Sequence, residues 1–189
     1  GQLSSTISVY TTNLYLSNIQ IEDSTNGIRS THCFSMHNST ISDASVTVEI
    51  LTSTTDEICE LHDNIFNNSP LIKILIATAS YEGNSLVFSH NVMNGIGSWL
   101  TTVNGNSITV SDNIWDGGSS SFSGSLLILE TKMKNSNSET RFERNSIRNS
   151  KWPMQFRKQT AGKFSIQNNQ VTGQSNRSNL ATIFNDDCS

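Results

Sequence analysis

One short pattern of apolar and polar positions recurs along this chain of 189 residues. It consists of an apolar residue, two variable residues, Asn or Ser, one variable residue and a second apolar residue. Seven copies occupy residues 14–19, 36–41, 61–66, 88–93, 110–115, 142–147 and 166–171, and a weaker eighth copy occupies 183–188. The polar positions of the seven copies are 22, 25, 27, 22, 32 and 24 residues apart. An average spacing of about 25 residues is typical of repeats that stack into a solenoid.

The residues ahead of each copy predict that it begins in a β-strand. Two positions before the leading apolar residue stands another residue that is usually apolar, and a period of two indicates a strand. These residues are Phe34, Cys59, Leu86, Ile108 and Phe164, with Thr12 and Thr140 as polar exceptions. Turn-forming Gly or Asn residues precede three of the copies, at 83–85, 105–107 and 160–162. Each repeat is therefore predicted to be a turn, a strand, a polar corner, a short strand and a variable loop.

This repeat favours an all-β fold, a single-stranded parallel β-helix solenoid of about 7–8 coils that average about 25 residues. Each coil is too short to bury its own apolar face, but coils stacked about 4.8 Å apart bury it together. We predict one domain over residues 1–189, either a segment of a longer solenoid or a unit that stacks by its ends. A β-sandwich or an irregular all-β domain is the alternative.

Stacking would place equivalent positions of successive coils in columns. One interior column is predicted to hold Leu14, Met36, Leu61, Phe88, Val110, Phe142 and Ile166. A second is predicted to hold Ile19, Ile41, Phe66, Met93, Trp115, Ile147 and Val171. The polar column between them would hold Ser17, Ser39, Asn64, Asn91, Asn113, Asn145 and Asn169. Because corner amides can form hydrogen bonds along the stack, the five asparagines of this column are predicted to form a structural ladder.

Composition narrows the class of protein. The chain has 22 Asn, 31 Ser and 19 Thr, and only 15% of its residues are charged. Such a composition suits a β-rich protein with many turns. A formal net charge of −4 argues against a nucleic-acid partner. No apolar run reaches the roughly 18–20 residues that span a bilayer, so no membrane span is expected.

The pattern and its asparagine column resemble the right-handed parallel β-helix of the pectate-lyase-like superfamily, over roughly residues 12–188. The shorter motif Phe-x-x-Asn, at 88–91 and 142–145, is similar to repeats of bacterial polymorphic outer-membrane proteins and autotransporter passengers. The Gly-Gly-Ala-Ile motif of the polymorphic family is absent from the sequence. This resemblance implies a right-handed solenoid. The superfamily includes lyases, hydrolases, tailspikes, adhesins and structural proteins, so the resemblance does not select one function.

Lyases of this superfamily use calcium held by clustered carboxylates, together with an Arg or Lys base. Asp63 and Asp112 each stand one position before the polar column, but the coil of His90 separates them. Their carboxylates would then lie about 10 Å apart at the stacking rise, which is too far to share one ion. The charges of this column, which also holds Arg144, are predicted to form a ladder that faces solvent.

Hydrolases of the superfamily carry Gly-His-Gly and Arg-x-Lys motifs, and this sequence contains neither. The Asp186-Asp187 doublet is predicted to be solvated. We therefore predict no catalytic residue, no metal site and no cofactor, and we favour a protein that is not an enzyme. If it were one, a polysaccharide lyase or glycoside hydrolase would be expected.

Basic residues are concentrated between 141 and 163, together with aromatic residues. The candidate glycan-binding residues are Arg148, Lys151, Trp152, Arg157 and Lys158. Cations beside aromatic rings can hold an acidic glycan, whereas the alternative is an ordinary solvated face.

Histidine and cysteine positions test the predicted register. His37 and His62 stand at the same offset, two positions before the polar column, and are predicted to stack in adjacent coils. No third ligand for a metal accompanies them in the pattern. Cys59 belongs to an inward column, whereas Cys33, next to the inward Phe34, is predicted to face outward. Opposed directions argue against a Cys33–Cys59 disulfide.

Three N-glycosylation sequons begin at Asn38, Asn67 and Asn176, and Asn38 is predicted to face solvent. We expect a non-enzymatic extracellular or cell-surface scaffold, structural or adhesive in role. Exposed strand edges at the ends of a β-helix invite pairing, so the expected partners are copies of the protein, or further coils of the same chain, stacked into fibres. The alternatives are a glycan-binding tailspike or adhesin module and a polysaccharide-degrading enzyme.

Overall fold

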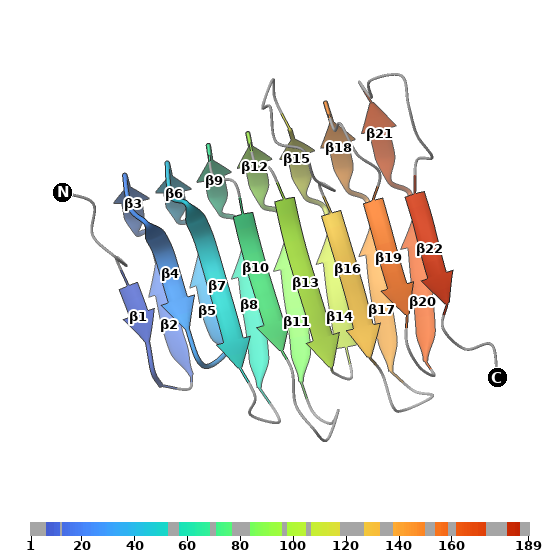
Figure 1. Ribbon diagram of the computed structural model, residues 1–189, viewed down its shortest axis with the longest axis horizontal. Helices are drawn as coiled ribbons and strands as arrows, with labels where there is room; N and C mark the ends of the chain where they lie inside the picture. Colours follow the sequence, from blue (N-terminus) through green and yellow to red (C-terminus); the bar gives the residue numbers. More distant parts are fainter. Residues whose placement is uncertain are drawn as a thin grey trace.

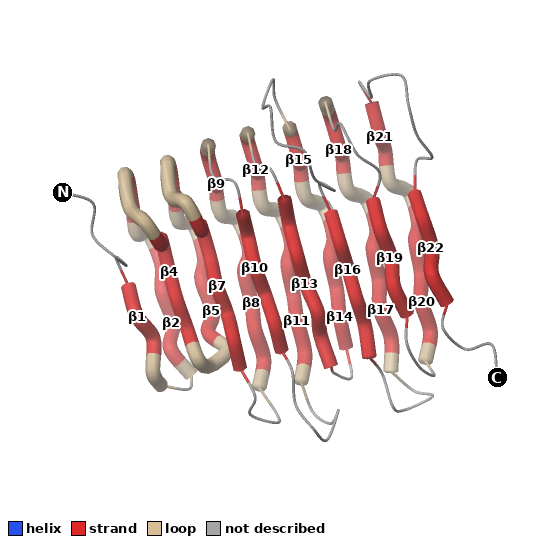
Figure 2. The backbone as a smooth tube through the Cα atoms, in the orientation of Figure 1, coloured by secondary structure: helices blue, strands red, loops and turns tan. Residues whose placement is uncertain are grey.

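The computed structural model describes residues 7–11, 13–52, 57–68, 71–76, 84–95, 98–104, 107–117, 127–132, 138–149, 154–158, 162–172 and 181–185. These residues form strands and turns but no helix (Figure 2). The strands belong to three sheets, through which the chain passes in turn (Figure 1). Neighbouring strands pair in parallel, from β2 with β5 to β19 with β22. This arrangement confirms the predicted all-β parallel β-helix.

Each sheet is built from every third strand along the chain. The first sheet contains β1 (Ile7–Val9), β4 (Asn26–Ser30), β7 (Val46–Thr52), β10 (Leu71–Ile76), β13 (Ser98–Asn104), β16 (Leu127–Lys132), β19 (Met154–Lys158) and β22 (Ala181–Asn185). The second sheet contains β2 (Leu14–Ser17), β5 (Phe34–His37), β8 (Ile58–His62), β11 (Ser85–Ser89), β14 (Ser107–Ser111), β17 (Glu139–Glu143) and β20 (Lys163–Gln167). The third sheet contains β3 (Gln20–Glu22), β6 (Thr40–Ser42), β9 (Ile65–Asn67), β12 (Val92–Asn94), β15 (Ile114–Asp116), β18 (Ser146–Arg148) and β21 (Gln170–Thr172).

A single left-handed residue turns the chain from the second sheet into the third. These corner residues are Asn18, Asn38, Asp63, His90, Asp112, Arg144 and Asn168, with φ between 49° and 59°. Asn, Asp and His adopt this conformation more readily than other residues with a side chain, whereas Arg144 is an unusual occupant of it. Because the left-handed residue reverses the side-chain alternation, the residue that follows it points inward. From the second coil on, this residue is the member of the polar column.

The first coil lies two residues away from its predicted register. Leu16, not Leu14, pairs with Met36, and Ile21, not Ile19, pairs with Ile41. Ile19 therefore occupies the corner position predicted for Ser17, and its backbone N–H donates to Ser39 Oγ at 3.3 Å. The shift turns Leu16 inward and Ser17 outward. Leu14 and Ile19 point inward in both registers, so matching these two apolar residues to the pattern did not distinguish the registers.

The weak eighth copy of the pattern is also misplaced. Its leading residue, Ile183, lies in β22 of the first sheet and pairs with Phe156. The leading residues of the other copies lie in the second sheet. Residues 186–189 lie outside the described part of the chain.

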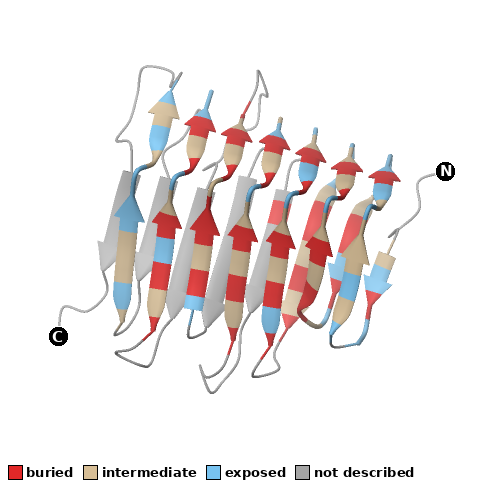
Figure 3. Ribbon diagram, turned by 180° about the vertical axis from the view of Figure 1, so that it is seen from behind, coloured by how far each residue is buried: buried red, intermediate tan, exposed pale blue. Residues whose placement is uncertain are grey.

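Buried apolar residues from all three sheets form the interior, and Figure 3 shows buried positions in red along the strands. From the second coil to the sixth, the two predicted apolar columns run in register, and their residues are almost fully buried. Their aromatic rings interleave across the two sheets. The ring centroids of Phe66 and Phe88, of Phe88 and Trp115, and of Trp115 and Phe142 are 6.4, 6.2 and 6.0 Å apart.

Corner asparagines are hydrogen-bonded from coil to coil. Asn113 Oδ1 accepts the backbone N–H of Asn91 at 2.9 Å and the Asn91 Nδ2 at 3.1 Å. Asn113 Nδ2 donates to the Phe88 carbonyl at 2.9 Å and to Asn145 Oδ1 at 3.0 Å. The amide thus uses both donors and both acceptor sites. The same bonds link Asn64 to Asn91 and Asn145 to Asn169.

Candidate functional site

The outer face of the second sheet carries a group of stacked rings near the start of the chain. Tyr15, His37 and His62 come from the adjacent strands β2, β5 and β8, and we call them the ring stack. The imidazoles of His37 and His62 have centroids 3.4 Å apart, which confirms the predicted stacking. The Tyr15 ring meets the His37 ring edge-on at 4.7 Å, and its hydroxyl is hydrogen-bonded to His37 Nδ1 at 3.1 Å.

Carboxylates lie beside the ring stack. Asp63, the corner residue of the third coil, bonds His62 Nδ1 through its Oδ2 at 2.7 Å. Glu60, on the same outer face, accepts the Ser35 hydroxyl at 3.2 Å. Burial lowers the pKa of His37 below its ordinary value, and the neighbouring His62 lowers it further, while Glu60 and Asp63 oppose the shift. His37 Nε2 is buried and has no hydrogen-bond partner in the described structure.

Further along the same face, charged residues pair between coils. Arg144 donates from Nε and Nη2 to the two carboxylate oxygens of Asp112, at 2.8 and 2.9 Å. Its Nη1 lies 2.9 Å from the Glu143 carboxylate. These hydrogen bonds lower the pKa of Asp112 below its usual value. The predicted solvent-facing charge ladder is thus present at Asp112 and Arg144.

The structure does not bring the predicted acidic candidates together. Asp63 is engaged by His62 and Asp112 by Arg144, so the two carboxylates have different partners. Among the described residues, no three His, Cys, Asp or Glu side chains form a group that could hold a metal ion. The Asp186-Asp187 doublet lies outside the described residues.

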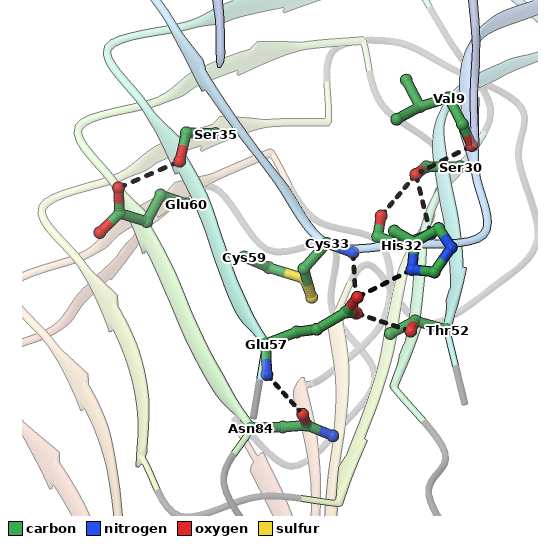
Figure 4. Close-up of a disulfide and its surroundings, with 10 residues drawn as sticks. All are labelled: Val9, Ser30, His32, Cys33, Ser35, Thr52, Glu57, Cys59, Glu60 and Asn84. Carbon is green, nitrogen blue, oxygen red and sulfur yellow. Dashed lines mark hydrogen bonds and ion pairs between the residues drawn. A yellow bond between two sulfur atoms is a disulfide. The ribbon is translucent and has the colours of Figure 1, made fainter. Parts of the chain in front are cut away.

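A second polar cluster lies at the corner between the first and second sheets (Figure 4). The buried carboxylate of Glu57 accepts the Thr52 hydroxyl at 2.7 Å and the Cys33 backbone N–H at 3.0 Å through Oε2. Its Oε1 lies 2.9 Å from His32 Nδ1. The Glu57 backbone N–H donates to the buried Asn84 Oδ1 at 3.1 Å. Glu57 and Asn84 therefore satisfy backbone groups of the preceding coil, as the asparagines do at the other corner.

This corner also holds a disulfide that the sequence argument wrongly excluded. Cys33 and Cys59 are bonded, with Cα atoms 4.6 Å apart, and both residues are buried. The prediction of an outward Cys33 assumes that the alternation of β5 extends back to Cys33, but β5 begins at Phe34. Cys33 belongs to the turn before the strand, where the alternation of side chains does not apply, and it faces inward beside Glu57.

The predicted glycan-binding residues that the structure describes belong to two different sheets. Arg148 ends β18 in the third sheet, is exposed, and donates from Nε to Ser146 Oγ at 3.2 Å. Arg157 and Lys158 belong to β19 in the first sheet. Lys151 and Trp152 lie outside the described residues.

The sequons differ in what their asparagines do. Asn38 is an exposed corner residue with φ of 49°. Asn67 lies within β9, where its Nδ2 donates to Ser42 Oγ at 3.3 Å and its Oδ1 accepts Asn94 Nδ2 at 3.0 Å. Asn176 lies outside the described residues.

Sequence reasoning missed the Glu57 cluster and Tyr15. The signal for the cluster was weak: His32 and Glu57 stand two positions before Phe34 and Cys59, as Asn84 does before Leu86, but their residue types differ and only Asn84 belongs to a recognisable turn. Tyr15 stands two positions before Ser17, as His37 does before Ser39, so the predicted register already aligned it with His37. In the structure Ser17 pairs with His37, and Tyr15 reaches His37 from the preceding outward position of β2.

Comparison of the chain with known protein families, with curated proteins and with solved structures finds no significant match. In the part of the chain that the structure describes, no helix is long and apolar enough to cross a membrane.

Proposed function

We propose that the chain is a non-enzymatic extracellular or cell-surface β-helix scaffold with a structural or adhesive role. The observation that carries this proposal is that polar side chains of the described residues bond mainly to groups of the neighbouring coils. Corner amides bond to the next coil, and outward charges such as Arg29 and Glu49, 3.1 Å apart, pair between neighbouring strands. Side chains used in this way stabilise a stack and leave the surface regular.

An extracellular or cell-surface location is consistent with the disulfide. Cys33 and Cys59 join adjacent coils, and disulfides persist in oxidising compartments such as the cell exterior. An exposed sequon at Asn38 would also be accessible there.

The proposed partners are further coils of this fold, supplied by the same chain or by copies of the protein. Ile166 of β20 is 36% exposed, whereas Phe88, Val110 and Phe142 of the same column are fully buried. Another coil stacked on β20 would bury Ile166 as the inner coils bury their equivalents, and apolar burial is worth roughly 25 cal/mol per Å².

Electron microscopy of the purified protein over a range of concentrations tests the proposal. We expect filaments with an axial repeat of roughly 35–40 Å, the height of about eight coils. The variant Ile166→Lys should abolish them, because it places a charge in the stacking surface. Ser165→Lys, one residue away on the outer face, is the matched control and should leave filaments intact.

Monomers of the wild-type protein at every concentration would contradict self-assembly. Binding in a glycan array that Arg148→Ala removes would favour the glycan-binding module instead, and cleavage of an acidic polysaccharide would favour the enzyme.

A further inference from the structure

The ring stack joins the first coil to the rest of the solenoid. β2 lies at the edge of the second sheet, where its described strand partner is β5. Its inward residues Leu14 and Leu16 are only partly buried, unlike their equivalents in the second to sixth coils. On the outer face, Tyr15 bonds to His37 and packs against its ring. One of the side-chain contacts that attach β2 to β5, the one between Tyr15 and His37, can therefore titrate.

We propose that the ring stack is an acid-sensitive clasp: it holds β2 on β5 while the His37 ring is neutral, and releases β2 when that ring takes up a proton. This proposal concerns the first coil alone and does not depend on the scaffold role.

The geometry explains why the folded structure resists a proton on His37. The His37 and His62 rings have centroids 3.4 Å apart, so a positive charge on His37 would lie against a second imidazole. His37 Nδ1 is hydrogen-bonded to the Tyr15 hydroxyl, whereas Nε2 is buried and has no hydrogen-bond partner among the described residues. A neutral ring can keep its proton on Nδ1, but a charged ring carries an N–H on both nitrogens and would leave a donor at the buried Nε2 without an acceptor.

Other groups around His37 do not remove this conflict. The side chains that face it from the packed strands are Tyr15 and Ser17 of β2, Ser35 on its own strand, and Glu60, His62 and Asp63 of the third coil. Of the two acids, Asp63 is bonded to His62 and Glu60 to Ser35. Both acids favour a proton on His37, but burial and His62 outweigh them, because the pKa of His37 is lowered overall.

The direction of the pH effect follows from this lowered pKa. In the released state His37 takes up a proton near its ordinary value of 6.5, whereas in the closed state it takes it up only at lower pH. The clasp is therefore fully effective above that ordinary value and weakens as the pH falls below it. Opening of β2 should increase about tenfold for each pH unit until the pKa of the closed state is reached.

Hydrogen exchange in the complete chain tests the proposal. After correction for intrinsic rates, the amides of β2 should show an increase in opening between pH 7.5 and pH 5 that the amides of β11 do not share. His37→Phe keeps an aromatic ring in the stack but cannot titrate, so its β2 opening should be independent of pH. His90→Gln, a histidine change outside the ring stack, is the matched control and should behave like the wild type.

Two results would overturn the proposal. One is β2 opening in the wild type that does not change with pH. The other is a His37→Phe variant with the wild-type dependence, which would assign the effect to Glu60 or Asp63. A nuclear magnetic resonance titration gives an independent test: the midpoint of His37 should lie below 6.5 and rise in His62→Gln.

Discussion

At the scale of single residues, the corner asparagines contribute most to the regularity of this protein. Each inner asparagine such as Asn113 joins three coils, because it accepts bonds from the preceding asparagine and donates to a carbonyl of that coil and to the next asparagine. A buried amide with all its partners is stabilising, whereas the same partners left unpaired are costly. The ladder therefore fixes both the bend of the chain and the alignment of its coils.

Asn113→Ala tests this role. The change leaves the Asn91 backbone N–H, the Asn91 side-chain amide and the Phe88 carbonyl without their partner in a buried corner. At about 1–3 kcal/mol for each of the three unsatisfied groups, we expect the free energy of unfolding to fall by at least about 3 kcal/mol. Urea denaturation measures the loss.

The matched control for this prediction is Asn94→Ala. Asn94 is exposed, and its Nδ2 donates to Asn67 Oδ1 at the surface. A loss of less than about 1 kcal/mol is expected there. Equal losses at the two sites would mean that the interior position of the ladder contributes nothing.

At the scale of strands and corners, close packing limits which residues fit. Gly27 of β4 faces the inside of the solenoid, where a Cβ would overlap the Thr47 carbonyl oxygen and lie 2.8 Å from Ile41 Cγ2. These atoms belong to the next strand of the first sheet and to the third sheet. A side chain at this point would therefore separate two sheets of the coil.

Gly27→Ala should lower the free energy of unfolding by about 1–3 kcal/mol, the usual effect of overpacking. The backbone oxygen of Thr47 cannot rotate away as a side chain would. Thermal unfolding followed by circular dichroism measures the shift. Thr109→Ala, on the outer face of β14, should leave the melting temperature within a few degrees of the wild type, and an unchanged melting temperature in Gly27→Ala would contradict the packing argument.

At the scale of the whole molecule, stability is a sum of contacts between neighbouring coils, because each coil meets only the coils beside it. The Cys33–Cys59 disulfide adds a covalent link between two of these coils, across 26 residues of sequence. Closing a loop of that length restricts the unfolded chain by about 3 kcal/mol. The link stabilises the coils that also carry the ring stack.

Replacing both cysteines, as Cys33→Ala with Cys59→Ala, should lower the free energy of unfolding by about 3 kcal/mol, measured by urea denaturation without reductant. Reductant should destabilise the wild type to a similar extent and leave the double variant unchanged. An effect of reductant on the double variant, or none on the wild type, would contradict a stabilising disulfide.

The repeat itself determined much about this protein. Its spacing and its period of two specify a stack of parallel strands, because only repeated coils align Leu61, Phe88 and Val110 in one column. The polar position between two apolar ones likewise indicates an inward corner, where a side chain must supply hydrogen-bond partners for buried backbone groups. Asn113 does so for the backbone N–H of Asn91. His37 and His62 could be placed together because columns follow directly from register.

Only the tertiary structure decided features that the alternation of side chains cannot specify. Leu14 and Ile19 point inward in either register of the first coil, so the position of Leu16 against Met36 depended on the left-handed corner at Asn18. Cys33 and Glu57 stand in turns, where side-chain direction depends on the path of the backbone and not on a period. Tyr15 and His37 are 22 residues apart in sequence, so their contact forms only when the first two coils stack.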